Sequence, residues 1–244
     1  MFLSVIAVSL LLLAVILVHV YFLPHYLLRF LVSRSDPSVF WCTFTSARTC
    51  SLTIDDAPSN STSAILDQLK KFKVTATFFI ISDQIPGHEE VMKRIVDEGH
   101  TLGNHLTEDR PSIRDSLETF EGKIMECESA IMEYQVIGKG KQIHKMKSKW
   151  LRPASGWFTS EMFRVIQKHG YRVCMGSVYP HDAQIKSEII NSLYLKYRTK
   201  SGSVLLIHDR PWTSGVLKDA LPDLTSKYKF ISVDELYDIH VTRS

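Results

Sequence analysis

Two carboxylates stand side by side at the end of a short apolar run. Asp55 and Asp56 follow residues 52–54 in the stretch LTIDDAPSNST. Adjacent anions repel each other, so solvent, a proton or a cation must offset their charge. A solvated turn would do this, because the Pro, Ser and Asn that follow are turn residues. A carboxylate pair that binds a metal ion and activates water is the alternative.

Asp, His and Arg also follow later apolar runs that are typical of strands. These residues are His105 with Asp109, Arg152, His181 with Asp182, and His208 with Asp209. In parallel α/β barrels the carboxyl ends of the strands meet on one face, where catalytic residues gather. Five strand ends that supply only Asp, His and Arg are hard to explain as solvation, so we predict a reactive site formed by them.

His105 and Asp109 are the pair with metal-ligand character. Four residues apart on one helical turn, their side chains would share a face. Imidazole nitrogen and carboxylate oxygen are good zinc ligands, and a catalytic zinc site uses three protein ligands and one water. Asp56 would supply the third ligand. The alternative is a helix start in which His105 or Thr107 is the cap and Asp109 favours the helix dipole.

The elements that would position these residues alternate from residue 51 onward. Expected strands cover 51–55, 74–82, 100–105, 149–154, 171–179, 203–209 and 229–236. Expected helices cover 62–72, 88–99, 117–134, 159–170, 187–198 and 216–228, and Gly99 and Gly170 are typical of helix C-caps. This alternation predicts a mostly parallel α/β fold, either a barrel or an open sheet, and about seven units favour a barrel.

The N-terminus differs from the rest of the chain. Residues 1–23 carry no charged side chain, and a helix needs about 20 apolar residues to span a bilayer. We therefore predict a single-pass transmembrane anchor over 1–23, a juxtamembrane linker over 24–50 and a globular domain over 51–244. Arg29 and Arg34 favour a cytosolic domain, whereas the glycosylation sequon at Asn60 would matter only in the secretory lumen or outside the cell. Both orientations stay open.

The bulk composition excludes several classes of protein. The 244 residues are 45% hydrophobic with a net charge of +3, and no basic face interleaved with aromatic residues points to nucleic acid as a partner. The G-x-S-x-G elbow of serine esterases is absent. The basic segment 137–149 lacks P-loop spacing, which leaves a solvated loop or a contact with an anionic surface. The sequence does not indicate an oligomeric state.

The four cysteines do not define the redox compartment. Cys42, Cys50, Cys127 and Cys174 permit three pairings and require none. Cys42 and Cys50 are close enough in sequence to bridge a small loop.

The order and spacing of the reactive residues resemble the polysaccharide deacetylase family (NodB-homology domains, carbohydrate esterase family four) over residues 51–238. The family motif T-F-D-D corresponds to residues 53–56, H-[ST]-x-x-H to residues 105–109, and the motif that begins R-P to Arg152 and Pro153. The Asp/Trp cluster is matched only by Asp182, and Leu-x-His by residues 206–208. NHLTED and GSVYPHD further resemble a chitin deacetylase-like subgroup.

The resemblance implies an irregular (β/α) barrel and assigns roles to the acidic pair. Asp56 and His105 would bind a divalent metal, with Asp109 in the place of the family's second His. The metal would be zinc, with cobalt or manganese as further candidates. Such an ion lowers the pKa of its bound water to about 7. Asp55 would be the general base that takes the proton from this water.

The resemblance also assigns the acid and the reaction. Arg152 would hold Asp55 ionised, and His208, tuned by Asp182, would protonate the leaving amine. The predicted reaction is metal-dependent hydrolysis of N-acetyl or O-acetyl groups on an acetylated glycan, above all chitin-like N-acetylglucosamine oligomers or polymers.

The chain departs from the family pattern at three positions. Asp109 replaces a His, Tyr179 an expected Asp, and Ala183 the Trp that walls the acetyl pocket. Trp157 or Trp212, together with Leu206, would then line the substrate pocket. These departures leave a second function open, a catalytically inactive, membrane-tethered glycan-binding protein on the same fold.

Overall fold

Alternating strands and helices form most of the chain. The computed structural model describes residues 2–137 and 148–242, except for the side chains of residues 2–5, 20, 136 and 137. The chain divides into two units, Met1–Asp36 and Pro37–Ser244. The first contains α1 (Phe2–Phe22) and α2 (His25–Arg34), and the second contains the strands and helices described below.

The predicted transmembrane helix over residues 1–23 is not supported. Among the described residues, no helix combines the length and the apolarity that crossing a membrane requires.

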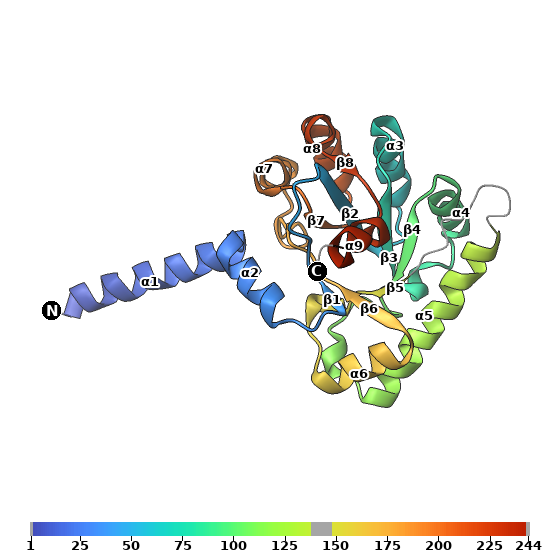
Figure 1. Cartoon of the computed structure of the whole chain (residues 1–244), viewed down its shortest axis with the longest axis horizontal. Helices are drawn as coiled ribbons and strands as arrows, with labels where there is room; N and C mark the ends of the chain where they lie inside the picture. Colours follow the sequence, from blue (N-terminus) through green and yellow to red (C-terminus); the bar gives the residue numbers. More distant parts are fainter. Residues whose placement is uncertain (1, 138–147, 243–244) are drawn as a thin grey trace. The chain divides into compact units, whose positions relative to one another are not determined.

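A sheet of parallel strands forms the centre of the second unit (Figure 1). Its order is β1-β6-β5-β4-β3-β2-β7, and β8 pairs with the beginning of β2. The strands are β1 (Val39–Phe40), β2 (Thr49–Ala57), β3 (Ala76–Ile80), β4 (Thr101–Asn104), β5 (Lys149–Leu151), β6 (Tyr171–Cys174), β7 (Val204–His208) and β8 (Lys229–Phe230). The seven-strand path confirms the predicted parallel α/β architecture. β1 lies inside the segment that was expected to be a linker.

Isolated bridges link the two edges of this curved sheet. Val178, which follows β6, pairs in parallel with Leu205 of β7, and Cys42, which follows β1, pairs with Ser203. The Leu206 N–H donates to the Val178 carbonyl at 2.9 Å, and the Thr43 N–H donates to the Gly202 carbonyl at 2.9 Å. The sheet therefore closes irregularly, as an irregular (β/α) barrel does.

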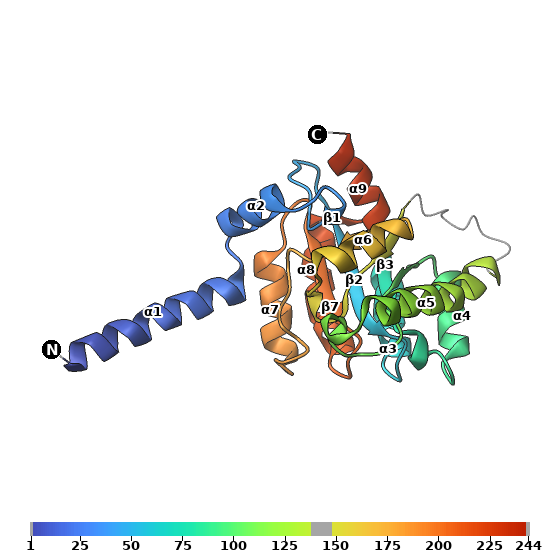
Figure 2. The same cartoon turned by 90° about the horizontal axis from the view of Figure 1, so that it is seen from below.

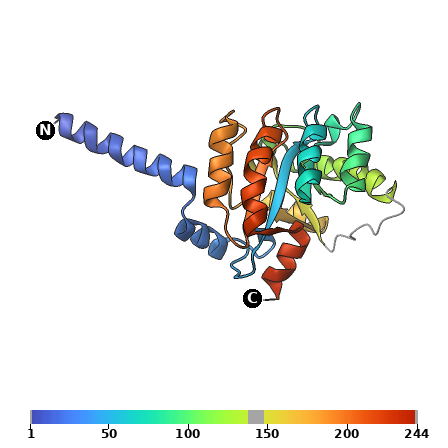
Figure 3. The same cartoon turned by 90° about the horizontal axis from the view of Figure 1, so that it is seen from above.

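Six helices surround the strands in the order α7, α8, α3, α4, α5 and α6 (Figures 1 and 3). They are α3 (Thr62–Phe72), α4 (Glu89–Asp97), α5 (Leu117–Ile137), α6 (Ser160–Lys168), α7 (Glu188–Arg198) and α8 (Thr213–Lys227). All six coincide with predicted helices to within a few residues. Gly99 and Gly170 follow the C-cap residues of α4 and α6 with φ of 85° and 74°, so each helix ends at a left-handed glycine, as predicted.

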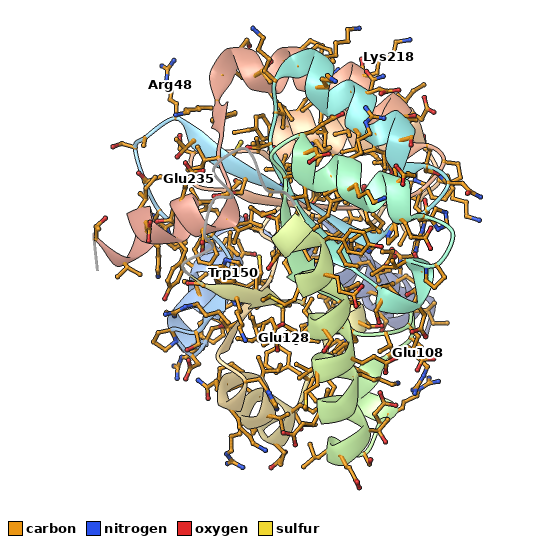
Figure 4. All side chains as sticks on the ribbon, turned by 90° about the vertical axis from the view of Figure 1, so that its right-hand side faces the viewer. Arg48, Glu108, Glu128, Trp150, Lys218 and Glu235 are labelled. Atoms are coloured by element: carbon orange, nitrogen blue, oxygen red, sulfur yellow. The ribbon has the colours of Figure 1, made fainter. Side chains whose placement is uncertain are left out.

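The last predicted strand, 229–236, is wrong beyond Phe230. A further helix, α9 (Val233–Val241), begins three residues after Phe230, because Ser232 and Glu235 form a capping box. Figure 2 shows α9 at one end of the strands. Its residues Val233, Leu236 and Tyr237 share a core cluster with Trp150 of β5. Trp150, seen beside the strands in Figure 4, also donates from Nε1 to Asp234 at 3.0 Å. This helix thus closes the barrel at the end opposite the carboxyl ends of the strands.

The register between β2 and β7 positions two predicted site residues side by side. Asp55 pairs with His208 across the two strands. Alternate residues of a strand point to the same side, so Ser51, Thr53 and Asp55 form a polar column inside the barrel. Ser51 Oγ donates to the Ser232 carbonyl at 3.0 Å. Asp55 lies at the other end of the column, where the site forms.

The predicted cysteine bridge is absent, and the described cysteines are buried. No Cys42–Cys50 bridge forms, because Cys50 is a buried thiol outside any disulfide, as are Cys127 and Cys174. Burial raises the pKa of Cys127 to about 12 and of Cys174 to about 11, so both thiols are protonated at neutral pH. Most of the basic segment, 138–147, lies outside the described residues.

A buried imidazole makes the stability of the fold depend on pH. His100 Nδ1 accepts a hydrogen bond from the Ala76 N–H at 3.1 Å. Burial lowers the pKa of His100 to about 4, while the charge of Glu98 raises it and that of Arg94 lowers it. The unfolded chain takes up a proton near pH 6.5 that the folded chain does not. Stability should therefore fall as the pH drops from 6.5 towards 4.

We predict that His100→Asn removes this part of the acid sensitivity. The amide oxygen of Asn can still accept from Ala76 but cannot take up a proton. Between pH 7 and pH 5 the wild-type chain should lose about 2 kcal/mol more of its unfolding free energy than the variant. Urea titrations of both proteins at pH 7 and pH 5 measure the difference. The stability difference between the two proteins at pH 7 gives the cost of lost packing. Equal losses in the two proteins would contradict the prediction.

Candidate active site

The carboxyl end of β2 brings both carboxylates to the same side of the backbone. Strand alternation would send consecutive side chains to opposite faces. Asp56, however, has φ of +62°, and the register of β2 shifts between Ile54 and Ala57. Asp55 and Asp56 are each only 3% exposed, and both approach one imidazole, His105. The left-handed residue therefore creates the acidic pair that the sequence suggested.

The unusual backbone at Asp56 is held by its surroundings. When the side-chain amide of Gln84 is oriented with its nitrogen towards the loop after β2, it donates to the carbonyl oxygens of Asp56 and Pro58, both at 2.9 Å. A left-handed conformation at a non-glycine residue costs of the order of 1–3 kcal/mol and persists only where neighbours fix it. Gln84 was not identified from the sequence, because nothing in its local pattern links it to Asp56.

Arg152 holds Asp55 from inside the barrel. The guanidinium donates from Nη1 to Asp55 Oδ1 and, at 2.9 Å, to Thr53 Oγ1. Its Nε donates to the Cys174 carbonyl at 2.8 Å, and Nη2 donates to the Met175 carbonyl at 3.3 Å. Arg152 is 2% exposed. This is a buried, fully bonded ion pair, in which the arginine keeps its charge at every accessible pH.

An aromatic ring supports the same guanidinium. The Cζ atom of Arg152 lies 4.1 Å from the centre of the Phe79 ring, a cation–π distance. Phe79 can lie there because its neighbour in β4 is Gly103, where a Cβ atom would come within 2.6 Å of the ring. The placement of Arg152 therefore also depends on a glycine one strand away.

His105 is oriented by the backbone of Arg152. A carbonyl oxygen can only accept, so His105 Nδ1 carries the proton that it donates to the Arg152 carbonyl at 2.6 Å. Nε2 then faces the acidic pair, 3.2 Å from Asp56 Oδ1 and 3.9 Å from Asp55 Oδ2. Burial lowers the pKa of His105, but the two carboxylates and the bond to Arg152 raise it above its usual value.

The segment after β4 is not the helical turn that was predicted. Residues 105–109 are irregular, and Leu106 has φ of +68°, which ends any helix there. The Leu106 N–H instead donates to the side chain of Asn104 at 2.9 Å. His105 and Asp109 therefore do not share a helix face. The side chain of Asp109 is 58% exposed, whereas that of His105 is 5% exposed.

Arg210 is a site residue that the sequence analysis missed. Its Nη2 donates to Asp56 Oδ2 at 2.6 Å and lies 3.5 Å from Asp109 Oδ2. Burial raises the pKa of Asp56, but the hydrogen bond with His105 and the charges of His105, His208 and Arg210 lower it far below its usual range. The only signal in the sequence that pointed to Arg210 was its position two residues after His208.

The residues present do not fit the predicted three-ligand metal site as they lie. A tetrahedral ion with bonds of 2.0–2.1 Å holds two ligand atoms about 3.3 Å apart, and Asp56 Oδ1 and His105 Nε2, at 3.2 Å, meet that spacing. Asp109 does not join them, and Arg210 contacts both aspartates instead. Across the described part of the chain, no three His, Cys, Asp or Glu side chains gather to hold a metal ion.

His208 and Asp182 form the second reactive pair. Asp182 accepts two hydrogen bonds from His208, at 2.9 Å from Nδ1 and at 2.8 Å from the backbone N–H. Burial lowers the pKa of His208, but the bond to Asp182 and the charges of Asp182, Asp55 and Asp56 raise it above its usual value. Tyr179, in the place of the family's Asp, has its ring centre 5.6 Å from that of His208. His208 is thus suited to hold a proton.

Asp209 is a buried carboxyl that links β7 to the loop after β2. It accepts a hydrogen bond from Ser59 Oγ at 2.9 Å and a second one from Thr62 Oγ1, and its N–H donates to the Asp55 carbonyl at 2.8 Å. Burial raises its pKa to about 6, against the hydroxyl hydrogen bonds and the charge of Arg210. These contacts fix the loop positions on both sides of Asp56.

The predicted substrate-binding residues are placed unevenly. Leu206 lies on the same side of β7 as His208, packed over Gly176. Trp212 is half-buried before α8, with Nε1 enclosed and Lys186 Nζ 5.8 Å from its ring centre. Trp157 is 71% exposed. Their roles in substrate binding stay predictions.

Comparison with known proteins identifies relatives over most of the chain. The family model described as polysaccharide deacetylase matches residues 44–174. A peptidoglycan-N-acetylglucosamine deacetylase of Bacillus cereus is 27% identical over 212 residues, which cover 81% of this chain and 92% of the relative.

Solved structures share the fold. A peptidoglycan N-acetylglucosamine deacetylase, crystallised with 4-naphthalen-1-yl-N-oxidanyl-benzamide, superposes with a TM-score of 0.73 at 22% identity, covering 82% of this chain and 93% of that one. A CE4 family pseudoenzyme from Bacillus anthracis superposes with a TM-score of 0.72 at 22% identity, covering 84% and 71%. At this identity the likeness concerns the fold.

We predict that Arg152→Met lowers the unfolding free energy by about 3–5 kcal/mol, because it leaves the buried Asp55 without its partner. In the double variant Arg152→Met/Asp55→Asn the unpaired charge is gone, so part of the loss should return. Urea unfolding of the three proteins measures both effects. Arg164→Met, whose side chain is 74% exposed, is the matched control and should change stability by about 0.5 kcal/mol or less. A double variant no more stable than the single one would refute the charge argument.

Proposed function

Because this chain belongs to the polysaccharide deacetylase family, we propose that it hydrolyses the N-acetyl group of N-acetylglucosamine units in a glycan. The observation that carries the proposal is the pairing of Asp55 with His208 across β2 and β7, each held by its own buried partner. The relatives favour a peptidoglycan-type substrate over the chitin-like polymer that the sequence suggested.

Asp55 is suited to the role of general base. Arg152 occupies Oδ1, while Oδ2 faces the cluster 3.9 Å from His105. In the proposed reaction Oδ2 takes a proton from a water molecule as the water oxygen attacks the acetyl carbonyl carbon. The oxygen of that carbonyl then carries the negative charge of a tetrahedral intermediate.

His208 is suited to the role of general acid. Asp182 fixes its Nδ1, so Nε2 is the nitrogen that can face a substrate. Collapse of the intermediate breaks the carbon–nitrogen bond, and the imidazolium gives its Nε2 proton to the leaving nitrogen. The products are acetate and a free amine on the sugar. The raised pKa of His208 favours the protonated form that this step needs.

A second function has its own observation. Arg210 already pairs with Asp56 and lies beside Asp109, so two of the predicted metal ligands are engaged by a side chain of the chain itself. A glycan-binding protein that retains the fold without hydrolysis would suit this arrangement. The pseudoenzyme with the same fold supports this alternative only at the level of the fold.

We predict that Asp55→Asn lowers acetate release by a factor of about 10²–10⁴, the usual contribution of a general base. The substrates are N-acetylglucosamine oligomers and a peptidoglycan preparation, and the measurement is released acetate. Asp223→Asn, which removes a half-buried carboxylate paired with Lys227, is the matched control and should retain activity. Glycan binding by the wild-type chain with no acetate release on either substrate would favour the binding function.

A further prediction concerns the pH dependence of kcat/KM. Asp182 raises the pKa of His208, so Asp182→Asn should lower it and the acid should lose its proton at a lower pH. The alkaline limb of the kcat/KM profile should therefore move to lower pH in this variant. Rates measured from pH 5 to pH 9 test the shift. An unmoved alkaline limb would show that His208 is not the group that titrates there.

A further inference from the structure

We propose that the guanidinium of Arg210 is a resident cation of the Asp56–Asp109 pair and that it keeps divalent metal ions from binding there. The sequence suggested that Asp56, His105 and Asp109 bind such an ion. In the structure a side chain of the chain itself takes this position between the two aspartates. The inference concerns metal affinity, and it does not depend on whether the chain hydrolyses a glycan.

The contacts of Arg210 are those of a bound cation. Its Nη2 lies 2.6 Å from Asp56 Oδ2, a charge-assisted hydrogen bond, and 3.5 Å from Asp109 Oδ2. Asp56 is buried, and its charge needs a positive partner at this depth. Arg210 supplies that partner and draws the exposed Asp109 into the same ion-pair network.

The guanidinium of Arg210 also bonds to the backbone of Asp209, a residue that is itself anchored. Nη1 donates to the Asp209 carbonyl at 3.2 Å, and Asp209 is itself anchored by Ser59 and by the Asp55 backbone. The side chain of Arg210 is 26% exposed. A guanidinium stays charged at every accessible pH. A divalent ion on Asp56 would therefore have to displace a fixed positive charge.

The donors that remain would suit a metal ion once that charge is removed. Asp56 Oδ1 and His105 Nε2 already lie 3.2 Å apart, near the spacing of two zinc ligands. The Arg152 carbonyl occupies Nδ1 of His105, so Nε2 is the ring nitrogen that faces Asp56. Asp109 is exposed and would be released from Arg210 to act as the third ligand.

The test is a zinc titration of the full chain, in which calorimetry measures the binding affinity. We expect Arg210→Ala to bind one Zn²⁺ at least tenfold more tightly than the wild-type chain. Arg210→Gln, which keeps a donor for Asp56 but removes the charge, is the second variant in case the first folds poorly, and it should show the same direction. Zinc should also raise the melting temperature of either variant more than that of the wild type.

Two further variants locate the effect. Adding His105→Ala to Arg210→Ala should abolish the gain if the ion binds at this cluster. Arg164→Ala, which removes an exposed arginine from α6, should leave the zinc affinity at the wild-type value. Wild-type affinity equal to that of Arg210→Ala would overturn the proposal. So would absence of zinc binding in both Arg210 variants, or a gain that survives the loss of His105.

Discussion

The buried ion pair between Arg152 and Asp55 is the interaction on which the rest of the site depends. A charged group inside a barrel costs several kcal/mol unless its charge and its hydrogen-bonding groups are satisfied. The guanidinium meets this requirement with Asp55, Thr53 and the backbone carbonyls of Cys174 and Met175. The backbone carbonyl of Arg152 also fixes the His105 ring. One residue therefore ties the orientation of the proposed base to that of its neighbouring imidazole.

Irregular backbone at the strand ends is the second constraint. Regular strands separate consecutive side chains onto opposite faces, which would prevent Asp55 and Asp56 from meeting one partner. Left-handed conformations at Asp56, Leu106 and His181 change the chain direction where the site forms. Such residues persist only where the surrounding structure compensates their cost. Gln84 at Asp56 and Asn104 at Leu106 provide that compensation here.

Charge balance separates the site into two halves with different chemistry. Asp55 and His208 each have one dedicated partner, Arg152 and Asp182 respectively. Asp56 and Asp109 instead share Arg210, a cation that cannot give up its charge. The first half is organised for acid–base chemistry, and the second is neutralised by the chain itself. This division is the reason that hydrolysis and glycan binding are both considered for the same fold.

The sequence by itself determined the alternation of strands and helices and the positions of Asp55, Arg152 and His208 at strand ends, because hydrophobic periodicity and local residue type can be read along the chain. It also contained the Ser232–Glu235 capping box that begins α9, although the strand-like run around it was misleading. Only the tertiary structure decided that residues 105–109 are not helical and that Arg210 reaches Asp56. These depend on single backbone conformations and on contacts between residues 154 positions apart in the sequence, and a local pattern contains neither.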